Sequence, residues 1–194
     1  DPEIVYVCGK RRGNVRDTSI VVMNADGSNQ TEVVDCGTMS CSWPDWSPDG
    51  SQIIFVSNAF DTFEPPYTEG IYVVNVDGSN LTKLIDLKGG RGQPAWSPVP
   101  VPGEHWIGYS DQARAAPPGT HDRFADGVDS DRTVPLTNFP DITVDEPAWS
   151  ADGAFLSARH QWDLHPWHVY GFIFAVEEVT TGEEIVPALG PWLH

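Results

Sequence analysis

A period of roughly fifty residues runs through this sequence, and three of the copies carry a tryptophan within a Pro-x-Trp-Ser run. Trp46, Trp96 and Trp149 lie 50 and 53 residues apart. A second marker keeps the same period, because "SIVVMNADGSNQT" at 19–31 matches "GIYVVNVDGSNLT" at 70–82, 51 residues later. A repeat of this length is one structural unit that stacks on its neighbours, so the chain is expected to fold as an array of similar units.

The residues inside each repeat predict short β-strands. Runs such as "IIFVS" and "IYVVN" are β-branched and aromatic, and Asp-Gly turns separate them. Gly (18 residues) and Pro (17 residues) are frequent, which would interrupt helices and suits tight turns. We therefore expect an all-β fold with four antiparallel strands per unit, which is the size of one propeller blade.

The run "PDWSPDGSQIIFVS" at 44–57, followed by "GIYVVNVDGSNLTKL" at 70–84, resembles the TolB-type β-propeller repeat. Blades of that family carry a Pro-x-Trp-Ser-Pro-Asp-Gly turn, an apolar strand and a strand ending in Asp-Gly. The resemblance covers nearly the whole chain and is weakest in the third unit, where "VPVPG" replaces the expected turn. It implies a β-propeller fold and a tendency towards protein interaction, without a defined reaction.

The repeat divides residues 1–194, taken as one domain, into four units at 1–41, 42–91, 92–144 and 145–190. The first unit has no Pro-x-Trp-Ser strand before Ile4, and Trp192 in "GPWLH" matches the missing tryptophan. We expect a four-bladed propeller that is closed by pairing of its N- and C-terminal strands, with 191–194 completing the first blade and protecting its edge. The alternatives are a fragment of a larger TolB-like propeller and a tail that inserts into a neighbouring copy.

The charge of the chain limits its partners. A net charge of −17 opposes binding to nucleic acid and to anionic membrane surfaces. No run approaches the roughly 18 apolar residues that a membrane span needs.

Basic and aromatic residues gather in long segments that are predicted to be loops on one face: 8–19, 57–70, 110–127 and 160–171. Because loops on a rigid scaffold collect binding residues, we predict a binding surface there. A molecule with unlike faces can also stack on further copies of itself and form a filament. The predicted binding residues are Arg11, Arg12, Arg114, Arg123, Trp162 and Trp167.

The run "HQWDLHPWH" holds a candidate metal site formed by His160, Asp163, His165 and His168. Imidazole and carboxylate ligands bind zinc and other divalent ions. Some propeller enzymes that act on uronic-acid sugars use histidines with a metal, so a lyase-like, carbohydrate-active enzyme is an alternative function. Pro166 disfavours a helix that would align the ligands, and the simpler interpretation is an aromatic loop with solvated histidines.

A second candidate cation site lies in "ADGVDSD", where Asp126, Asp129 and Asp131 could bind calcium. The match to a calcium loop is partial, because the terminal bidentate Glu and the intervening Gly are absent. A solvated turn is the alternative interpretation, since Asp and Gly form turns readily.

Two further sequence features bear on the compartment. Cys36 and Cys41 are spaced to form a disulfide, which would imply an oxidising environment, and Cys8 has no partner near in sequence. Asn29 and Asn80 begin Asn-x-Thr sequons, although the same letters also form the turn of the repeat. Glycosylation there is predicted only for an exported protein in a host that glycosylates its surface proteins.

The sequence carries few signs of catalysis: no nucleophile elbow, phosphate-binding glycine loop or haem-attachment motif occurs. The sequence thus predicts a secreted, cell-surface or periplasmic module that needs no cofactor and binds a protein partner or copies of itself. Carbohydrate is an alternative ligand. The repeat tryptophans are predicted to pack between units.

Overall fold

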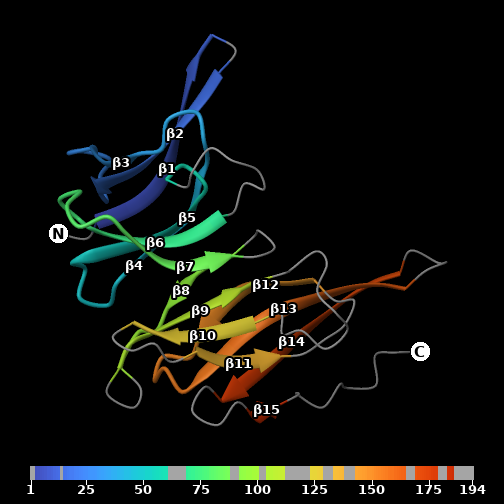
Figure 1. Cartoon of the computed structure of the whole chain (residues 1–194). Helices are drawn as coiled ribbons and strands as arrows, with labels where there is room; N and C mark the ends of the chain where they lie inside the picture. Colours follow the sequence, from blue (N-terminus) through green and yellow to red (C-terminus); the bar gives the residue numbers. More distant parts are fainter. Residues whose placement is uncertain are drawn as a thin grey trace. The chain divides into compact units, whose positions relative to one another are not determined.

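The computed structural model describes residues 3–13, 15–60, 69–87, 92–100, 104–111, 123–128, 133–137, 143–164, 169–178 and 183–185. The regular elements in these ranges are all β-strands, paired antiparallel in four sheets (Figure 1). The predicted all-β class is therefore confirmed. The chain divides into two compact units, Asp1–Pro94 and Ala95–His194.

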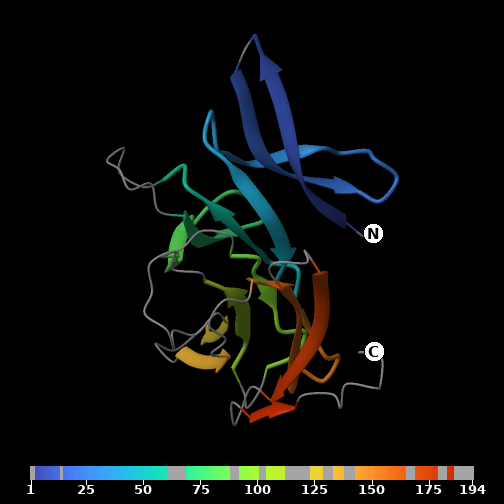
Figure 2. The same cartoon turned by 90° about the vertical axis from the view of Figure 1, so that its right-hand side faces the viewer.

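The first sheet has its strands in chain order: β1 (Glu3–Arg12), β2 (Val15–Asn24) and β3 (Thr31–Asp35). β1 and β2 pair along their whole length, from Glu3 opposite Asn24 to Arg12 opposite Val15. The pairing of β2 with β3 ends at Ser19 opposite Asp35. The β1–β2 hairpin therefore runs on past the third strand, as Figures 1 and 2 show.

This hairpin corrects the prediction of a long loop at 8–19, because residues up to Arg12 and from Val15 onward are paired strand. The segment is poor in β-formers, and the ladder is continued by the cross-strand partner rather than by local propensity. Gly13 has φ 65°, which a tight turn between the strands requires and which favours glycine. The predicted loop at 160–171 is corrected in the same way, since β13 continues to Leu164 and β14 begins at Val169.

The second sheet of the first unit has four strands: β4 (Cys41–Trp46), β5 (Gln52–Ser57), β6 (Glu69–Asn75) and β7 (Thr82–Leu87). Ile53, Ile54, Phe55 and Val56 follow one another in β5 and are all buried, so both faces of this strand are covered. Its strand order follows the chain, as the repeat predicted.

The core of the first unit lies between its two sheets. Cys36 and Cys41 are part of this core and form the predicted disulfide, which joins the end of β3 to the start of β4. The backbone N–H of Cys41 donates to Thr18 Oγ1 (3.0 Å), so the linker is also held to β2. The buried core residues are Ile20, Val22, Val34, Cys36, Cys41, Ile53, Phe55, Tyr72 and Val74.

The second unit contains two further four-stranded sheets. One sheet comprises β8 (Ala95–Trp96), β9 (Trp106–Ser110), β10 (Arg123–Gly127) and β11 (Thr133–Thr137). The other comprises β12 (Thr143–Trp149), β13 (Phe155–Leu164), β14 (Val169–Glu178) and β15 (Glu183–Ile185).

The two sheets of the second unit pack closely at Gly108. A Cβ added there would meet Leu156 Cδ2 at 2.7 Å, so a side chain would displace the buried leucine. Glycine inside a strand often marks such an approach. The glycine in "WIGYS" is therefore explained by packing.

The repeat tryptophans are buried or partly buried, in keeping with the predicted packing role. Trp149 Nε1 on β12 donates to the backbone oxygen of Ala95 on β8 at 2.8 Å. Trp46 packs on the core of the first unit, and Trp96 is 7% exposed.

Ring closure and the boundaries of the four repeats stay predictions. Residues 191–194 lie outside the described part of the chain, and among the described strands β1 is paired on one side. Ile4 on β1 is 41% exposed, whereas Ile53 at the corresponding position of β5 is fully buried beside β4. In the described residues there is no helix long and apolar enough to cross a membrane.

Candidate functional site

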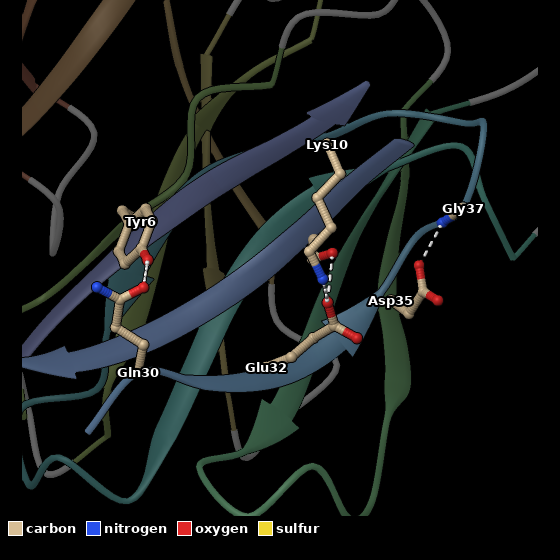
Figure 3. Close-up of polar contacts among 7 residues, drawn as sticks. Tyr6, Lys10, Gln30, Glu32, Asp35 and Gly37 are labelled. Atoms are coloured by element: carbon tan, nitrogen blue, oxygen red, sulfur yellow. Dashed lines mark hydrogen bonds and ion pairs between the residues drawn. The ribbon is translucent and has the colours of Figure 1, made fainter. Parts of the chain in front are cut away.

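One face of the first sheet carries a polar cluster that joins all three strands (Figure 3). Lys10 Nζ on β1 forms an ion pair with Glu32 Oε2 on β3 at 2.7 Å. Ser19 Oγ on β2 donates to the same carboxylate oxygen at 2.8 Å. Glu32 thus holds the middle of the hairpin against the third strand.

The hydrogen bond and the charge of Glu32 raise the pKa of Lys10. The side chains of Lys10 and Glu32 are 52% and 37% exposed, so solvent screens their attraction. The ion pair therefore positions Lys10 more than it stabilises the fold.

Three further hydrogen bonds order the edges of the same face, and Figure 3 shows those of Tyr6 with Gln30 and of Asp35 with Gly37. Tyr6 Oη donates to Gln30 Oε1 at 3.2 Å, and Gln30 Nε2 donates to the backbone oxygen of Gly27 at 3.1 Å. At the other end of β3, Asp35 Oδ1 accepts from the backbone N–H of Gly37 at 2.9 Å. These bonds tie the turn after β2 and the linker after β3 to the sheet.

The end of the hairpin, which includes Lys10 of the cluster, is a segment that we name the basic ribbon, residues 9–13 and 15–17. It contains Lys10, Arg11, Arg12 and Arg16 and one acid, Asp17, for a formal charge of +3 in a chain of −17. Arg11 is exposed, and its Nε donates to the backbone oxygen of Gly13 at 3.3 Å. The register places Arg11 directly opposite Arg16.

Acidic turns occupy the other end of the same two sheets. The backbone places them there: β2 runs from Val15 in the ribbon to Asn24 and the turn at 25–30, and β4 starts beside Thr18 and leads to the turn at 47–51. The turn at 76–81 lies beside them, because Val76 N–H donates to the backbone oxygen of Ser51 at 3.0 Å. We name these three segments the acidic turns; each carries one aspartate and none carries a basic residue.

Serine hydrogen bonds keep the three aspartates ionised. Asp49 Oδ1 accepts from Ser47 Oγ at 2.7 Å and from Ser51 N–H and Oγ at 3.0 and 2.8 Å, and these bonds lower the pKa of Asp49 to about 2. Bonds from Ser28 and Ser79 lower the pKa values of Asp26 and Asp77 in the same way. The first unit therefore has a positive end and a negative end.

The predicted binding residues fall in different parts of the fold. Arg11 and Arg12 are consecutive residues of β1 in the basic ribbon, and Arg123 begins β10. Trp162 is on β13, where the structure describes the backbone alone. Arg114 and Trp167 lie outside the described residues.

Both metal sites stay predictions. His160 and Asp163 are on β13, three residues apart, and positions an odd number apart alternate to opposite faces of a strand. His165 and His168 are outside the described residues, as are Asp129 and Asp131, whereas Asp126 is on β10. Within the described ranges, no three His, Cys, Asp or Glu side chains gather as metal ligands would.

The sequon asparagines have a structural role in equivalent turns. Asn29 and Asn80 have φ values of 53° and 55°, a left-handed conformation that asparagine tolerates. Thr31 Oγ1 and Thr82 Oγ1 donate to the backbone oxygens of these asparagines at 3.3 and 3.2 Å. Both asparagines are exposed, and their glycosylation stays a prediction.

The sequence reasoning did not single out Trp43. Its side chain is 52% exposed and its φ is 54°, at a β-bulge where the pairing of β4 with β5 shifts between Ser42 and Asp45. A signal existed, because the residue three before the repeat tryptophan is Gln93 in one unit and Glu146 in another. Trp43 is thus an exposed aromatic residue at a position that is polar elsewhere.

The chain is similar in part of its sequence to a TolB protein and in fold to β-propeller structures. No family model matches it. It is 32% identical over 107 residues to an uncharacterised protein of Agrobacterium fabrum, which covers 50% of this chain and 34% of that protein. It is also 32% identical over 96 residues to the Tol-Pal system protein TolB of Alcanivorax borkumensis, covering 50% of this chain and 20% of TolB.

Solved structures share the fold at low sequence identity. A protein assigned as TolB from Agrobacterium tumefaciens matches with a TM-score of 0.66 and 15% identity, over 94% of this chain and 60% of that one. The β-propeller domain of the Trilobed protease from Pyrococcus furiosus matches with a TM-score of 0.64 and 16% identity, over 95% and 53%. An oligogalacturonate lyase in complex with manganese matches with a TM-score of 0.60 and 13% identity, over 98% and 51%. The chain thus spans 60% or less of each of these relatives.

Proposed function

We propose that this chain is a non-catalytic protein-interaction module of the TolB-like propeller type. The observation that carries the proposal is the basic ribbon, a projecting hairpin with charge opposite to that of the whole chain. Exposed elements on a rigid β-scaffold are where binding residues collect. The resemblance to TolB supports an interaction role.

We also propose export to the periplasm, the cell surface or the medium. The Cys36–Cys41 disulfide supports this, because disulfides persist in oxidising compartments. The partial match to a Tol-Pal system protein points the same way.

The architecture that we propose is a closed ring of four blades. In the other three sheets the repeat tryptophan pairs opposite a fixed position of the next strand: Ile53, Ile107 and Leu156. Ile4 holds that position in β1, so Trp192 is the residue that would lie opposite it. The variant Ile4→Cys, Trp192→Cys, in a Cys8→Ser background, would form an intramolecular crosslink in such a ring and an intermolecular one in a strand exchange. Failure to crosslink would favour a fragment of a larger propeller.

A second candidate function is a metal-dependent, carbohydrate-active enzyme. The observation that favours it is the fold shared with a manganese-bound oligogalacturonate lyase, together with the histidine run at 160–168. Metal analysis after purification without chelators separates the two functions. Stoichiometric metal that is lost with lyase activity in the His165→Ala variant would support the enzyme.

The interaction function is tested by capture from the exported-protein fraction of the native host. The immobilised full chain is compared with the ribbon variant Arg11→Glu, Arg12→Glu, Arg16→Glu. A variant with the same change in net charge, Lys88→Glu, Arg91→Glu, Arg132→Glu, is the control. We expect a stoichiometric protein, or the chain itself, on the wild type and the control and not on the ribbon variant. Equal recovery on all three would contradict the proposal.

A further inference from the structure

The structure provides the basic ribbon with a complementary surface on the molecule itself, and we infer that the ribbon docks on the acidic turns of a second copy of this chain. The inference rests on the proposed interaction function and names its partner. The inference is based on the opposite charges of the two ends of the first unit.

The ribbon extends past the strand length of the second sheet, as does the β13–β14 hairpin, which also pairs over ten positions. In the second sheet, β5 and β6 pair from Gln52 opposite Asn75 to Ser57 opposite Gly70. The corresponding strands β1 and β2 continue for four more pairs, from Gly9 opposite Thr18 to Arg12 opposite Val15. A two-stranded ribbon without a third strand is marginally stable in water, so packing within its own sheet does not explain the extension.

The charges of the ribbon also go beyond what its own fold needs. Arg11 directly opposite Arg16 is a like-charge pair, which destabilises a hairpin. Lys10 is committed to Glu32, and no carboxylate in the described part of the chain pairs with the exposed Arg11. A negatively charged partner would relieve the repulsion between the two strands.

The acidic turns offer such a surface. Three adjacent turns each carry one exposed aspartate: Asp26, Asp49 and Asp77. Glu3 lies at the same end of the sheet, because it pairs opposite Asn24. Serine hydrogen bonds fix their carboxylates before any partner arrives. A preordered acidic surface therefore loses little conformational freedom on binding a cation.

The placement of the two surfaces determines the kind of assembly. They lie at opposite ends of the same two sheets, so one copy can use its ribbon while its own turns accept the ribbon of the next. Such a heterologous contact leaves one ribbon and one set of acidic turns free at the ends of the assembly. Copies therefore add into open chains unless the rotation between them closes a ring. The overall charge of −17 repels copies at long range, but at about 0.15 M salt the screening length is about 8 Å, so charges in contact decide.

The test is sedimentation velocity of the full chain at about 0.15 M salt, over a concentration range up to about 200 µM. Wild type and the control variant (Lys88→Glu, Arg91→Glu, Arg132→Glu) are expected to associate as concentration rises. The ribbon variant (Arg11→Glu, Arg12→Glu, Arg16→Glu) is expected to associate at least tenfold more weakly. The turn variant (Asp26→Asn, Asp49→Asn, Asp77→Asn) keeps the acceptor oxygens of the turns, removes their charge, and should show the same loss.

A mixture of the two defective variants tests the head-to-tail arrangement. The turn variant has an intact ribbon, and the ribbon variant has intact turns, so an equimolar mixture should form dimers and nothing larger. A wild type that stays monomeric throughout, or variants that all associate equally, would overturn the inference. The interaction function would still stand in that case if a different exported protein were captured through the ribbon, and both would fail if capture were also independent of the ribbon.

Discussion

The indole Nε1 of Trp149 donates a 2.8 Å hydrogen bond to the backbone oxygen of Ala95, 54 residues earlier in the chain. Trp149 ends β12 and Ala95 begins β8, so the bond joins the first strands of two successive sheets. The repeat tryptophan therefore fastens one repeat to the one before it, in addition to filling space between them.

We expect Trp149→Phe to lower the free energy of unfolding more than Trp46→Phe does. Both substitutions remove the same ring volume, but Trp46 Nε1 is buried without a hydrogen-bond partner among the described residues. The difference combines the lost bond to Ala95 with the removal of an unpaired N–H at Trp46, and should be at least about 0.5–1.5 kcal/mol. Urea denaturation of the two variants measures it, and equal losses would show that the bond contributes nothing.

Replacing Trp43 by Asn should stabilise the fold. A bulky residue at φ 54° is strained, and the following Pro44 disfavours that conformation further. Asparagine tolerates it, so we expect a gain of about 1 kcal/mol for Trp43→Asn and a smaller change for Trp43→Ala. Thermal unfolding compares the three proteins. A clear loss of stability in Trp43→Asn would mean that the indole packs against the fold despite its exposure.

The free energy of unfolding should fall as the solution is acidified, over a pH range set by the pKa of Asp49. Its pKa in the folded state is about 2, below the ordinary value of 3.8, so the folded state binds this proton less readily than the unfolded one. The contribution is present above about pH 4 and is lost as pH falls towards 2. Melting temperatures measured between these values should change less steeply in Asp49→Asn, which keeps the turn acceptor. Parallel curves for the two proteins would argue against the assignment.

Removing the disulfide should destabilise the first unit. The loop closed by Cys36 and Cys41 is short, and the entropy of closing it corresponds to about 2 kcal/mol. The Cys36→Ser, Cys41→Ser variant should lose this amount in chemical denaturation, and wild type should lose it in reductant. Cys8→Ser serves as the control, because Cys8 is not in a disulfide. A reductant-insensitive wild type would contradict the prediction.

The parts of the fold that the sequence predicted well are those in which one signal determines the local structure. The near-identity of 19–31 and 70–82 indicated two copies of the same strand, turn and strand, and both turns have a left-handed asparagine. The residues of β10 (Arg123–Gly127) were a poor strand by composition, but β9 and β11 pair with them on both sides. Hydrogen bonds from neighbouring strands override propensity there.

The candidate site could be predicted only in part, because its contacts depend on strand pairing that the local sequence does not determine. Arg11 and Arg12 are predicted binding residues from the basic run that contains them, and Arg11 is exposed. The contact of Lys10 with Glu32, 22 residues later, depends on the register of three strands, which composition does not reveal. The distinction between a loop and a paired ribbon at 8–19 depends on that register as well.

The uninterrupted register of β1 with β2 limits how this hairpin can change in length. Ten consecutive pairs run from Glu3 to Arg12 without a bulge, so Tyr6 and Lys10 share the face on which they meet β3. Deleting one residue between them would turn every later side chain to the opposite face and separate Lys10 from Glu32. Sequence changes can therefore shorten or lengthen the hairpin near its tip by removing or adding the same number of residues in both strands. The part of the hairpin that contacts Glu32 on β3 would stay constant.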